Sequence, residues 1–198
     1  MSVVSFKERV RNEIIKGASI YKFIFCDYEY LIYSKNFKEQ PYYIISANED
    51  NYQHLTGVNT NLSPREFFIK CLNGTITETD FNFKKGYKSE KSIKGSVREK
   101  IISLPELSIL FSSELQAEES FSKGVVNCLL ATTNKTITLG FVNRIKSRPN
   151  TLLKGNQLNK TKSVDISLVL RRNKGADKFR DVIQGDIIDE FVSLFPDL

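Results

Sequence analysis

The fold is decided by Gly124–Ala131 (GVVNCLLA) and Thr136–Val142 (TITLGFV), two apolar runs joined through Thr133-Asn134-Lys135. Short runs rich in β-branched residues on either side of a polar turn predict a β-hairpin. Val164–Arg171 has the same character and predicts a further strand. An antiparallel sheet in the second half of the chain is therefore expected.

The first half of the chain contains three more runs rich in Tyr, Phe and Ile. They are Ser19–Cys26, Glu29–Lys35 and Tyr42–Ser46, separated by short polar segments. The pattern predicts three antiparallel strands.

Helices are predicted around these strands. The first covers Phe6–Ile15 and is closed by Gly17; the second runs from Pro64, with Ser63 as its cap, to Leu72. A third runs from Ser96 to Phe111, interrupted by Pro105, and an acidic C-terminal helix covers 184–195. We find no repeat and no linker, so the sequence predicts one α+β domain over 1–198. Its curved antiparallel sheet would carry the helices on one face.

Charge is unevenly distributed within a net charge of +6. Residues 121–180 hold 13 Lys and Arg against two Asp, residues 1–120 hold 16 charges of each sign, and residues 181–198 hold five acids. A concentrated basic segment is typical of a protein that binds a polyanion. A solvated basic face is the alternative. We favour nucleic acid, with the acidic end as a segment that would fold back and weaken this interaction.

Cysteine content and hydropathy exclude several classes of protein. The chain has three widely spaced cysteines, no Cys-x-x-Cys pair and one histidine, so we expect no disulfide framework, no metal ion and no cofactor. No apolar run approaches the length of a membrane span, and the first residues lack a signal pattern. We therefore expect a cytoplasmic protein without a membrane partner.

The single histidine lies in Asn51-Tyr52-Gln53-His54-Leu55-Thr56-Gly57, which we expect at the end of a strand or in the following turn. Histidine exchanges a proton near neutral pH, so His54 is a candidate for acid–base chemistry. A lone histidine is more often a capping or partly buried residue, and from this feature alone that interpretation is the better one.

A second polar segment, Arg148-Pro149-Asn150-Thr151-Leu152-Leu153-Lys154, follows the hairpin. Asn150 and Thr151 offer hydrogen-bond donors, and Arg148 and Lys154 flank them with positive charge suited to phosphate. A turn with solvent-facing charges is the simpler interpretation. Further cations and hydroxyls that we expect to bind nucleic acid are Thr56, Lys146, Lys162, Arg171 and Arg172.

Together these segments resemble a known family. The order of Tyr-Gln-His-Leu-Thr-Gly, Pro-Arg-Glu-Phe-Phe, Cys-Leu-Asn-Gly, Leu-Gly-Phe and Pro-Asn-Thr-Leu-Leu is similar to that in phage barnase/EndoU/colicin/RelE-like nucleases, over roughly residues 40–172. The resemblance implies helices on a curved antiparallel sheet and a metal-independent ribonuclease. In that reaction the RNA 2′-hydroxyl attacks its own phosphodiester and leaves a 2′,3′-cyclic phosphate.

The resemblance also implies roles for individual residues. His54 would transfer a proton, Thr151 with Asn150 would match the family's polar loop, and Arg148 and Lys154 would hold the phosphate. No second histidine exists, so Lys, Glu, Tyr or the substrate would take the other proton-transfer role. The expected partners are RNA, as tRNA or mRNA, and an immunity or antitoxin protein.

Two other functions remain open. A non-catalytic module of a phage or mobile element would use the basic segment to bind nucleic acid or a host protein, with His54 incidental. A metal-dependent enzyme acting on DNA is weaker, because the sequence offers no convincing carboxylate–lysine motif for it.

Overall fold

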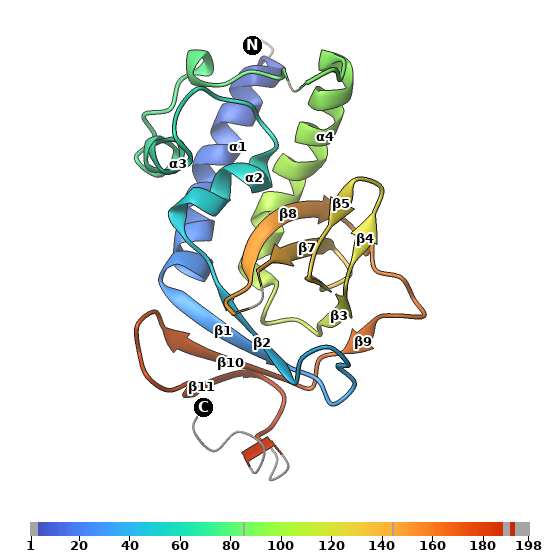
Figure 1. Ribbon diagram of the computed structural model, residues 1–198. Coiled ribbons are helices and arrows are strands. Elements are labelled where there is room, and N and C mark those ends of the chain that lie inside the picture. The colour runs from blue at the N-terminus through green and yellow to red at the C-terminus, as the bar shows by residue number, and fades with distance from the viewer. Residues whose placement is uncertain (1–3, 85, 144, 188–190, 193–198) are drawn as a thin grey trace.

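The computed structural model describes residues 4–84, 86–143, 145–187 and 191–192. Helices form one layer, and antiparallel strands form two sheets against it (Figure 1). The predicted α+β class with antiparallel strands is confirmed. Within the described residues, no helix is both long and apolar enough to span a bilayer.

The helical layer contains four α-helices, one π-helical segment and three short 3₁₀ segments among the described residues. The α-helices are α1 (Phe6–Tyr21), α2 (Tyr52–Thr56), α3 (Pro64–Leu72) and α4 (Glu90–Ser103), the π-helix is η1 (Lys22–Cys26), and the 3₁₀ segments are η2 (Glu49–Asn51), η3 (Glu78–Asp80) and η4 (Leu104–Ile109). Helix α3 has the predicted bounds, and the Ser63 hydroxyl accepts a hydrogen bond from the Glu66 amide, as a capping residue does. It packs on α1 and α2.

The first helix is longer than predicted. α1 continues through Gly17 to Tyr21, and η1 extends it to Cys26, so the predicted strand Ser19–Cys26 is wrong. The reason is packing: Val10, Ile14, Ala18 and Tyr21 form one fully buried stripe at helical spacing. Local strand propensity in the aromatic run is overridden by this stripe.

The third predicted helix is also displaced. α4 begins at Glu90, six residues before the expected start, because Ser89 caps it through the Ser92 amide. Pro105 ends regular α-helix, as expected, and the chain continues as η4. The residues on which the core depends, Val97 and Ile101, do face inward.

The strands form two main sheets and a small hairpin. One sheet has the order β11-β10-β1-β2, the other β8-β7-β6-β3-β9, and β4 pairs with β5. Their bounds are β1 (Tyr28–Tyr33), β2 (Tyr42–Ser46), β3 (Gln116–Glu119), β4 (Ser122–Lys123), β5 (Val126–Asn127), β6 (Leu130–Thr133), β7 (Ile137–Val142), β8 (Arg148–Lys154), β9 (Val164–Asp165), β10 (Leu168–Asn173) and β11 (Asp181–Gln184).

The predicted hairpin is present as β6 and β7, with Lys135 in the left-handed region at φ 76° in its turn. The first part of its predicted first strand instead forms β5, and the predicted strand Val164–Arg171 divides into β9 and β10. β9 joins one sheet and β10 the other. The single predicted sheet is therefore two sheets, and the chain passes from one to the other between β9 and β10.

The two sheets meet at a short parallel contact. Ile45 of β2 and Ser147, just before β8, form an isolated parallel bridge, in which the Ser46 amide donates to the Ser147 carbonyl at 3.0 Å. From this point β2 and β8 leave in the same direction. The chain after β2, which includes α2, consequently packs along β8.

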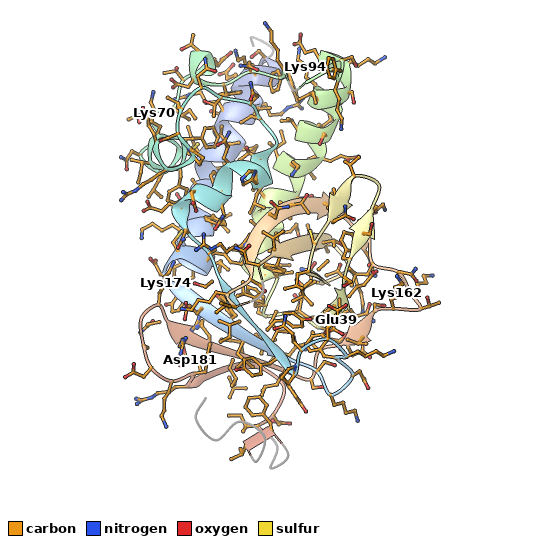
Figure 2. All side chains as sticks on the ribbon, viewed as in Figure 1. Glu39, Lys70, Lys94, Lys162, Lys174 and Asp181 are labelled. Carbon is orange, nitrogen blue, oxygen red and sulfur yellow. The ribbon has the colours of Figure 1, made fainter. Side chains whose placement is uncertain are left out.

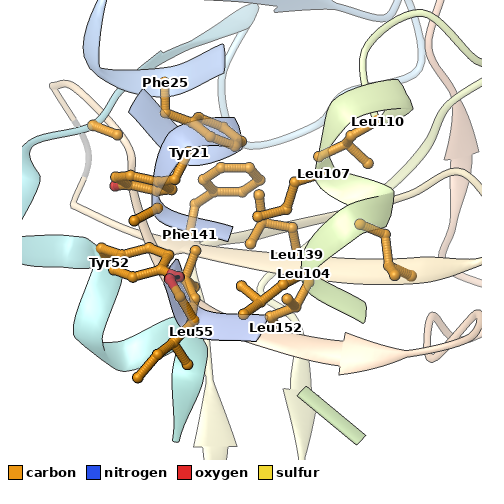
Figure 3. Packing of buried hydrophobic residues seen from close by; sticks show 14 of the residues in the cluster. Tyr21, Phe25, Tyr52, Leu55, Leu104, Leu107, Leu110, Leu139, Phe141 and Leu152 are labelled. Atoms are coloured by element: carbon orange, nitrogen blue, oxygen red, sulfur yellow. Dashed lines mark hydrogen bonds between the residues drawn. The ribbon is translucent and has the colours of Figure 1, made fainter. Parts of the chain in front are cut away.

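The main core lies between the helices and the five-stranded sheet. Tyr21 and Tyr52 pack with their rings tilted and the ring centroids 5.2 Å apart, and Phe141 and Leu152 of the sheet join the same cluster (Figure 3). Each such side chain stabilises the fold by about 1.5–3 kcal/mol through burial. This cluster fixes the position of α2.

Within the predicted acidic helix over 184–195, residues 191 and 192 are helical, whereas residues 184–187 are not. Gln184 belongs to β11, while most of the remaining span lies outside the described residues. Phe191 packs against Tyr33 of β1, with ring centroids 5.2 Å apart.

Gly17 and Gly95 provide a matched pair for testing the packing of α1. A methyl group at Gly17 would lie 2.7 Å from the Tyr52 hydroxyl oxygen and 3.0 Å from Leu104 Cδ1, whereas one at Gly95 would meet nothing within 4 Å. Alanine raises helix propensity by about 1 kcal/mol at both positions. We expect Gly17→Ala to lower the free energy of unfolding by about 1–2 kcal/mol, because overpacking outweighs propensity.

Gly95→Ala should raise the same free energy by about 0.5–1 kcal/mol. Urea unfolding followed by circular dichroism measures both variants. Equal changes of the same sign would show that α1 does not pack closely on Tyr52.

Candidate active site

The histidine segment is a single helical turn and not the predicted turn after a strand. Asn48 and Asn51 form a reciprocal capping box around the 3₁₀ segment η2, which leads directly into α2, and Gly57, at φ 74°, ends α2. Tyr52 and Leu55 are fully buried, and the Tyr52 hydroxyl donates to the Ile14 carbonyl at 2.5 Å. This anchoring leaves the side chain of His54 on the exposed side of α2.

Lys100 of α4 contacts the end of this turn. Its ammonium donates a hydrogen bond of 2.9 Å to the His54 backbone carbonyl, and a methyl group at Gly57 would lie 2.6 Å from Lys100 Cδ. A cation at a helix C-terminus satisfies a carbonyl that has no partner within the helix. Sequence analysis missed Lys100, because nothing in the sequence of α4 distinguishes it from the other lysines there.

The second predicted segment is strand β8, at the edge of its sheet, and not a loop. Edge position accommodates Pro149, which has no amide hydrogen to donate. Gly140 pairs with Thr151 and Phe141 with Pro149, so Asn150 is the extra residue of a β-bulge. A β-bulge redirects side chains locally, and its position could not be predicted from the sequence.

Three of the predicted site residues share one face of β8. Thr151, only 8% exposed, lies beside Gly140, where a methyl group would be 2.8 Å from its Cγ2 and 2.6 Å from Cys128 Sγ. Asn150 hydrogen-bonds Cys128. Strand alternation puts Arg148 on the same face, because its neighbour Pro149 lies opposite the core residue Phe141.

Lys154 does not join this face. It lies two residues after Leu152, whose side chain enters the main core on the opposite side of the strand. The Cys128 thiol, in contrast, lies at the centre of the polar face, and its burial raises its pKa, although the hydrogen bond with Asn150 opposes that effect. A buried thiol of this kind is a packing group and not a nucleophile.

The parallel bridge brings α2 and β8 together. α2 crosses beside the start of β8, so the His54 turn and the Arg148–Thr151 segment are neighbours (Figure 1). Neither the guanidinium of Arg148 nor the ammonium of Lys154 has an ion pair among the described residues. α2, with the exposed His54, is therefore a neighbour of β8, whose Arg148, Asn150 and Thr151 lie on the face away from the main core.

Thr56, in contrast, has a structural role. Its hydroxyl donates to the Gln53 carbonyl at 2.8 Å and accepts from the Val58 amide, and the residue is fully buried. It closes the α2 turn and is not available to a phosphate, which is a correction to its predicted binding role.

Two other predicted RNA-binding cations hold a buried carboxylate. Glu29 of β1, 1% exposed, accepts hydrogen bonds from Lys146 at 2.6 Å and from Arg172 at 2.7 and 2.9 Å. Burial by itself would raise the pKa of Glu29, but hydrogen bonds from Lys146, Ser46 and Arg172 outweigh it and hold the pKa at about 2. Lys146 and Arg172 are thus both engaged by Glu29, the Lys146 side chain remains 49% exposed, and direct RNA binding by the two stays a prediction.

Arg171 and Lys162 are also remote from α2. Arg171 pairs with Asp181 at 3.0 Å and lies over the Tyr28 ring. Lys162 is exposed on the connection between β8 and β9, on the side of the molecule away from α2 (Figure 2). The structure does not bring these two cations to the His54 turn.

A cavity of about 470 Å³ opens beside the start of α2. It is lined by Lys22, Cys26, Asp27, Asn48, Glu49, Asp50, Arg65 and Lys174. Its cations are engaged: Lys22 pairs with Asp27, Arg65 pairs with Glu49, and Lys174 donates to the Asn48 side chain. Burial raises the pKa of the Cys26 thiol to about 12, so this group is protonated at neutral pH.

Metal-ligating side chains do not gather in the part of the chain that the structure describes. Among these residues no three His, Cys, Asp or Glu side chains form a group able to hold a metal ion.

Comparison with known proteins gives one match. The model of a family described as "phage-Barnase-EndoU-ColicinE5/D-RelE like nuclease4" matches residues 13–181, which is well over half of the chain and includes both α2 and β8. No curated protein matches, and no solved structure does either.

The Glu29 cluster predicts how stability depends on pH. Because its folded-state pKa is lower than that in the unfolded chain, Glu29 stabilises the fold above about pH 4.5, and this contribution disappears as the pH falls towards 2. We expect Glu29→Gln to lower the free energy of unfolding at pH 7 by about 2–4 kcal/mol, because two cations lose their partner.

The difference in stability between the native protein and Glu29→Gln should shrink from pH 5 to pH 2, measured by urea unfolding at each pH. Glu114→Gln is the control, since Glu114 is 90% exposed and pairs with Lys135 only at 3.5 Å. A difference that stays constant over this range would contradict the proposed role of the Glu29 charge.

Proposed function

Because the chain belongs to the phage-Barnase-EndoU-ColicinE5/D-RelE like nuclease4 family and is thus a nuclease, we propose that it cleaves RNA by intramolecular transesterification. The 2′-hydroxyl would attack the adjacent phosphorus, the bond to the 5′ oxygen would break, and a 2′,3′-cyclic phosphate and a 5′-hydroxyl would result. One group must remove the 2′ proton and another must protonate the leaving oxygen.

One observation carries this proposal: the exposed His54 on α2 lies beside the edge strand that carries Arg148, Asn150 and Thr151. We assign the removal of the 2′ proton to His54. Imidazole is suited to this step because it accepts and releases protons near neutral pH. The rigid anchoring of Tyr52 and Leu55 fixes its position relative to β8.

Arg148 is assigned to the phosphate. A guanidinium binds two phosphate oxygens at once and remains charged throughout the reaction, so it stabilises the extra negative charge of the transition state. Asn150 would donate a hydrogen bond from the bulge, and the buried Thr151 would hold the bulge in position. Lys154 supplies positive charge farther along the strand.

Lys100 is the best-placed group for the second proton transfer. Its ammonium is held against the end of α2 by the His54 carbonyl, 2.9 Å away. An ammonium carries a proton to give and, while it holds that proton, adds positive charge near the phosphate. This assignment replaces the second histidine of a two-histidine mechanism, which the sequence does not have.

The proposal predicts cleavage of total RNA in the presence of EDTA, with 2′,3′-cyclic phosphate ends. His54→Ala should lower the rate by about 10²–10⁴-fold, the usual effect of losing one proton-transfer group. Gln53→Ala, on the same helical turn, is the matched control and should retain activity. Gel analysis with end mapping measures both.

A substrate with one 2′-deoxyribose at the cleavage position tests the nucleophile. It should resist cleavage, because the attacking hydroxyl is missing. Cleavage of that substrate at the normal rate would show that an external water attacks. Full activity of His54→Ala, or no activity of the native protein, would favour a binding module.

A further inference from the structure

A basic surface lies at the end of the helical layer, in a part of the chain that segment charge alone did not single out. Residues 84–100 hold seven Lys and Arg against two Glu. Six cations from this segment and from the start of α1 lie at this end of the molecule, and we call them the α4 patch: Lys7, Lys84, Lys88, Lys91, Lys94 and Arg98. Figure 2 labels Lys94 at this end of the molecule.

Most of this charge is not neutralised. Lys84, Lys88 and Lys91 are exposed and have no ion pair among the described residues, whereas Lys94 pairs with Glu90 at 2.7 Å. In the basic segment 121–180, by comparison, Lys146, Arg171 and Arg172 have carboxylate partners, whereas other cations of that segment, such as Arg148 and Lys154, have no ion pair among the described residues.

Aromatic rings are interleaved with these cations. Tyr87, in the turn before α4, is fully exposed, and the ring of Phe6 is half-buried. Arg98 lies over Phe6 at 5.1 Å, and Lys94 lies over Phe83 at 5.4 Å, measured to the ring centroids. The exposed ring of Tyr87 is thus the stacking surface among these cations, because the rings of Phe6 and Phe83 already contact cations and each other.

The patch also contains a cavity of about 310 Å³. Phe6 and Phe83 form its apolar wall, Lys7, Lys84 and Lys94 its basic rim, and Glu90 is its one acidic residue among those described. An apolar wall beneath three ammonium groups fits a ligand with a flat apolar face and negative charge beside it. A nucleotide unit of a single strand has both.

We propose that the α4 patch is a binding surface for single-stranded RNA, separate from the His54 site. Single-stranded nucleic acid is held where cations follow its backbone and aromatic side chains stack on its bases. The patch has both features, and duplex RNA would hide the bases from the exposed ring of Tyr87. The inference rests on the proposed ribonuclease function and extends it, because substrates would be long enough to reach both surfaces.

The α4 patch and the His54 site use cations on different flanks of α4. On α4, Lys94 and Arg98 lie on the flank that faces Phe6 and Phe83, while Lys100 lies on the flank that contacts α2. RNA bound to the patch therefore occupies the side of α4 away from His54. The two surfaces can be tested separately.

Binding is measured in a His54→Ala background, so that RNA stays intact, by fluorescence anisotropy of a labelled single-stranded RNA over a range of salt concentrations. The patch variant is Lys84→Gln with Lys88→Gln and Lys91→Gln. The control removes the same charge from exposed lysines at the other end of the molecule, as Lys35→Gln with Lys38→Gln and Lys178→Gln.

We expect the patch variant to weaken binding at least tenfold and to reduce the slope of log affinity against log salt by about 2, since each phosphate contact on a single strand contributes about 0.7. The control should change the slope by less than half as much. Tyr87→Ala should weaken binding about fivefold or more through lost stacking. Duplex RNA of the same length should bind more weakly than single-stranded RNA.

Equal effects of the patch and control variants would overturn the proposal, as would equal binding of duplex and single strand. Unchanged RNA affinity in the patch variant would favour an acidic protein as the partner of this surface and would also overturn it. Absence of cleavage by the native protein would instead refute the proposed function and leave this binding result interpretable.

Discussion

The buried carboxylate of Glu29 is the interaction on which the arrangement of the two sheets depends. It lies on β1, it is bound by Arg172 of β10 in the same sheet, and it is bound by Lys146 from the segment that leads into β8 of the other sheet. One residue beyond Lys146, Ser147 forms the parallel bridge to Ile45. A buried charge without partners would be strongly unfavourable, so this residue requires both sheets in their observed positions.

That constraint also places the candidate site. The bridge makes β2 and β8 run in the same direction, and the chain beyond β2 turns into α2 beside β8. α2, which carries His54, packs beside β8 because of this path, although nearly a hundred residues separate the two segments. The site is thus a consequence of how the sheets are joined and not of either segment alone.

Sequence analysis predicted those parts of the fold in which local signals and packing agree. Helix α3 has a capping serine and an N-terminal proline, and β2 has a short aromatic run; both have the predicted bounds. The strand predicted at Ser19–Cys26 was wrong because this β-prone sequence lies on the buried stripe of a helix, where tertiary packing determines the secondary structure. The α2 turn was not predicted because it follows η2, whose capping box uses Asn48 and Asn51, and asparagine is equally common in turns.

For the site, the residue types were predictable and their partners were not. His54, Arg148 and Asn150 are recognisable by chemistry, but the bulge at Asn150, the contact of Lys100 with α2 and the pairing of Lys146 and Arg172 with Glu29 all depend on contacts between distant segments.

The charge distribution shows that cations grouped in the sequence need not form a basic surface in the folded protein. The segment 121–180 has the largest positive excess, yet three of its expected RNA-binding cations have carboxylate partners from elsewhere in the chain. The first 120 residues have no net charge, yet folding gathers Lys7, Lys84 and Lys94 around one cavity with Glu90 as its one acidic residue among those described. An electrostatic footprint is a property of a surface, because only charges that remain unpaired and exposed attract a polyanion. Lysines whose side chains hold the fold together cannot also release counterions from RNA, and the surface that does so is determined by the folded arrangement.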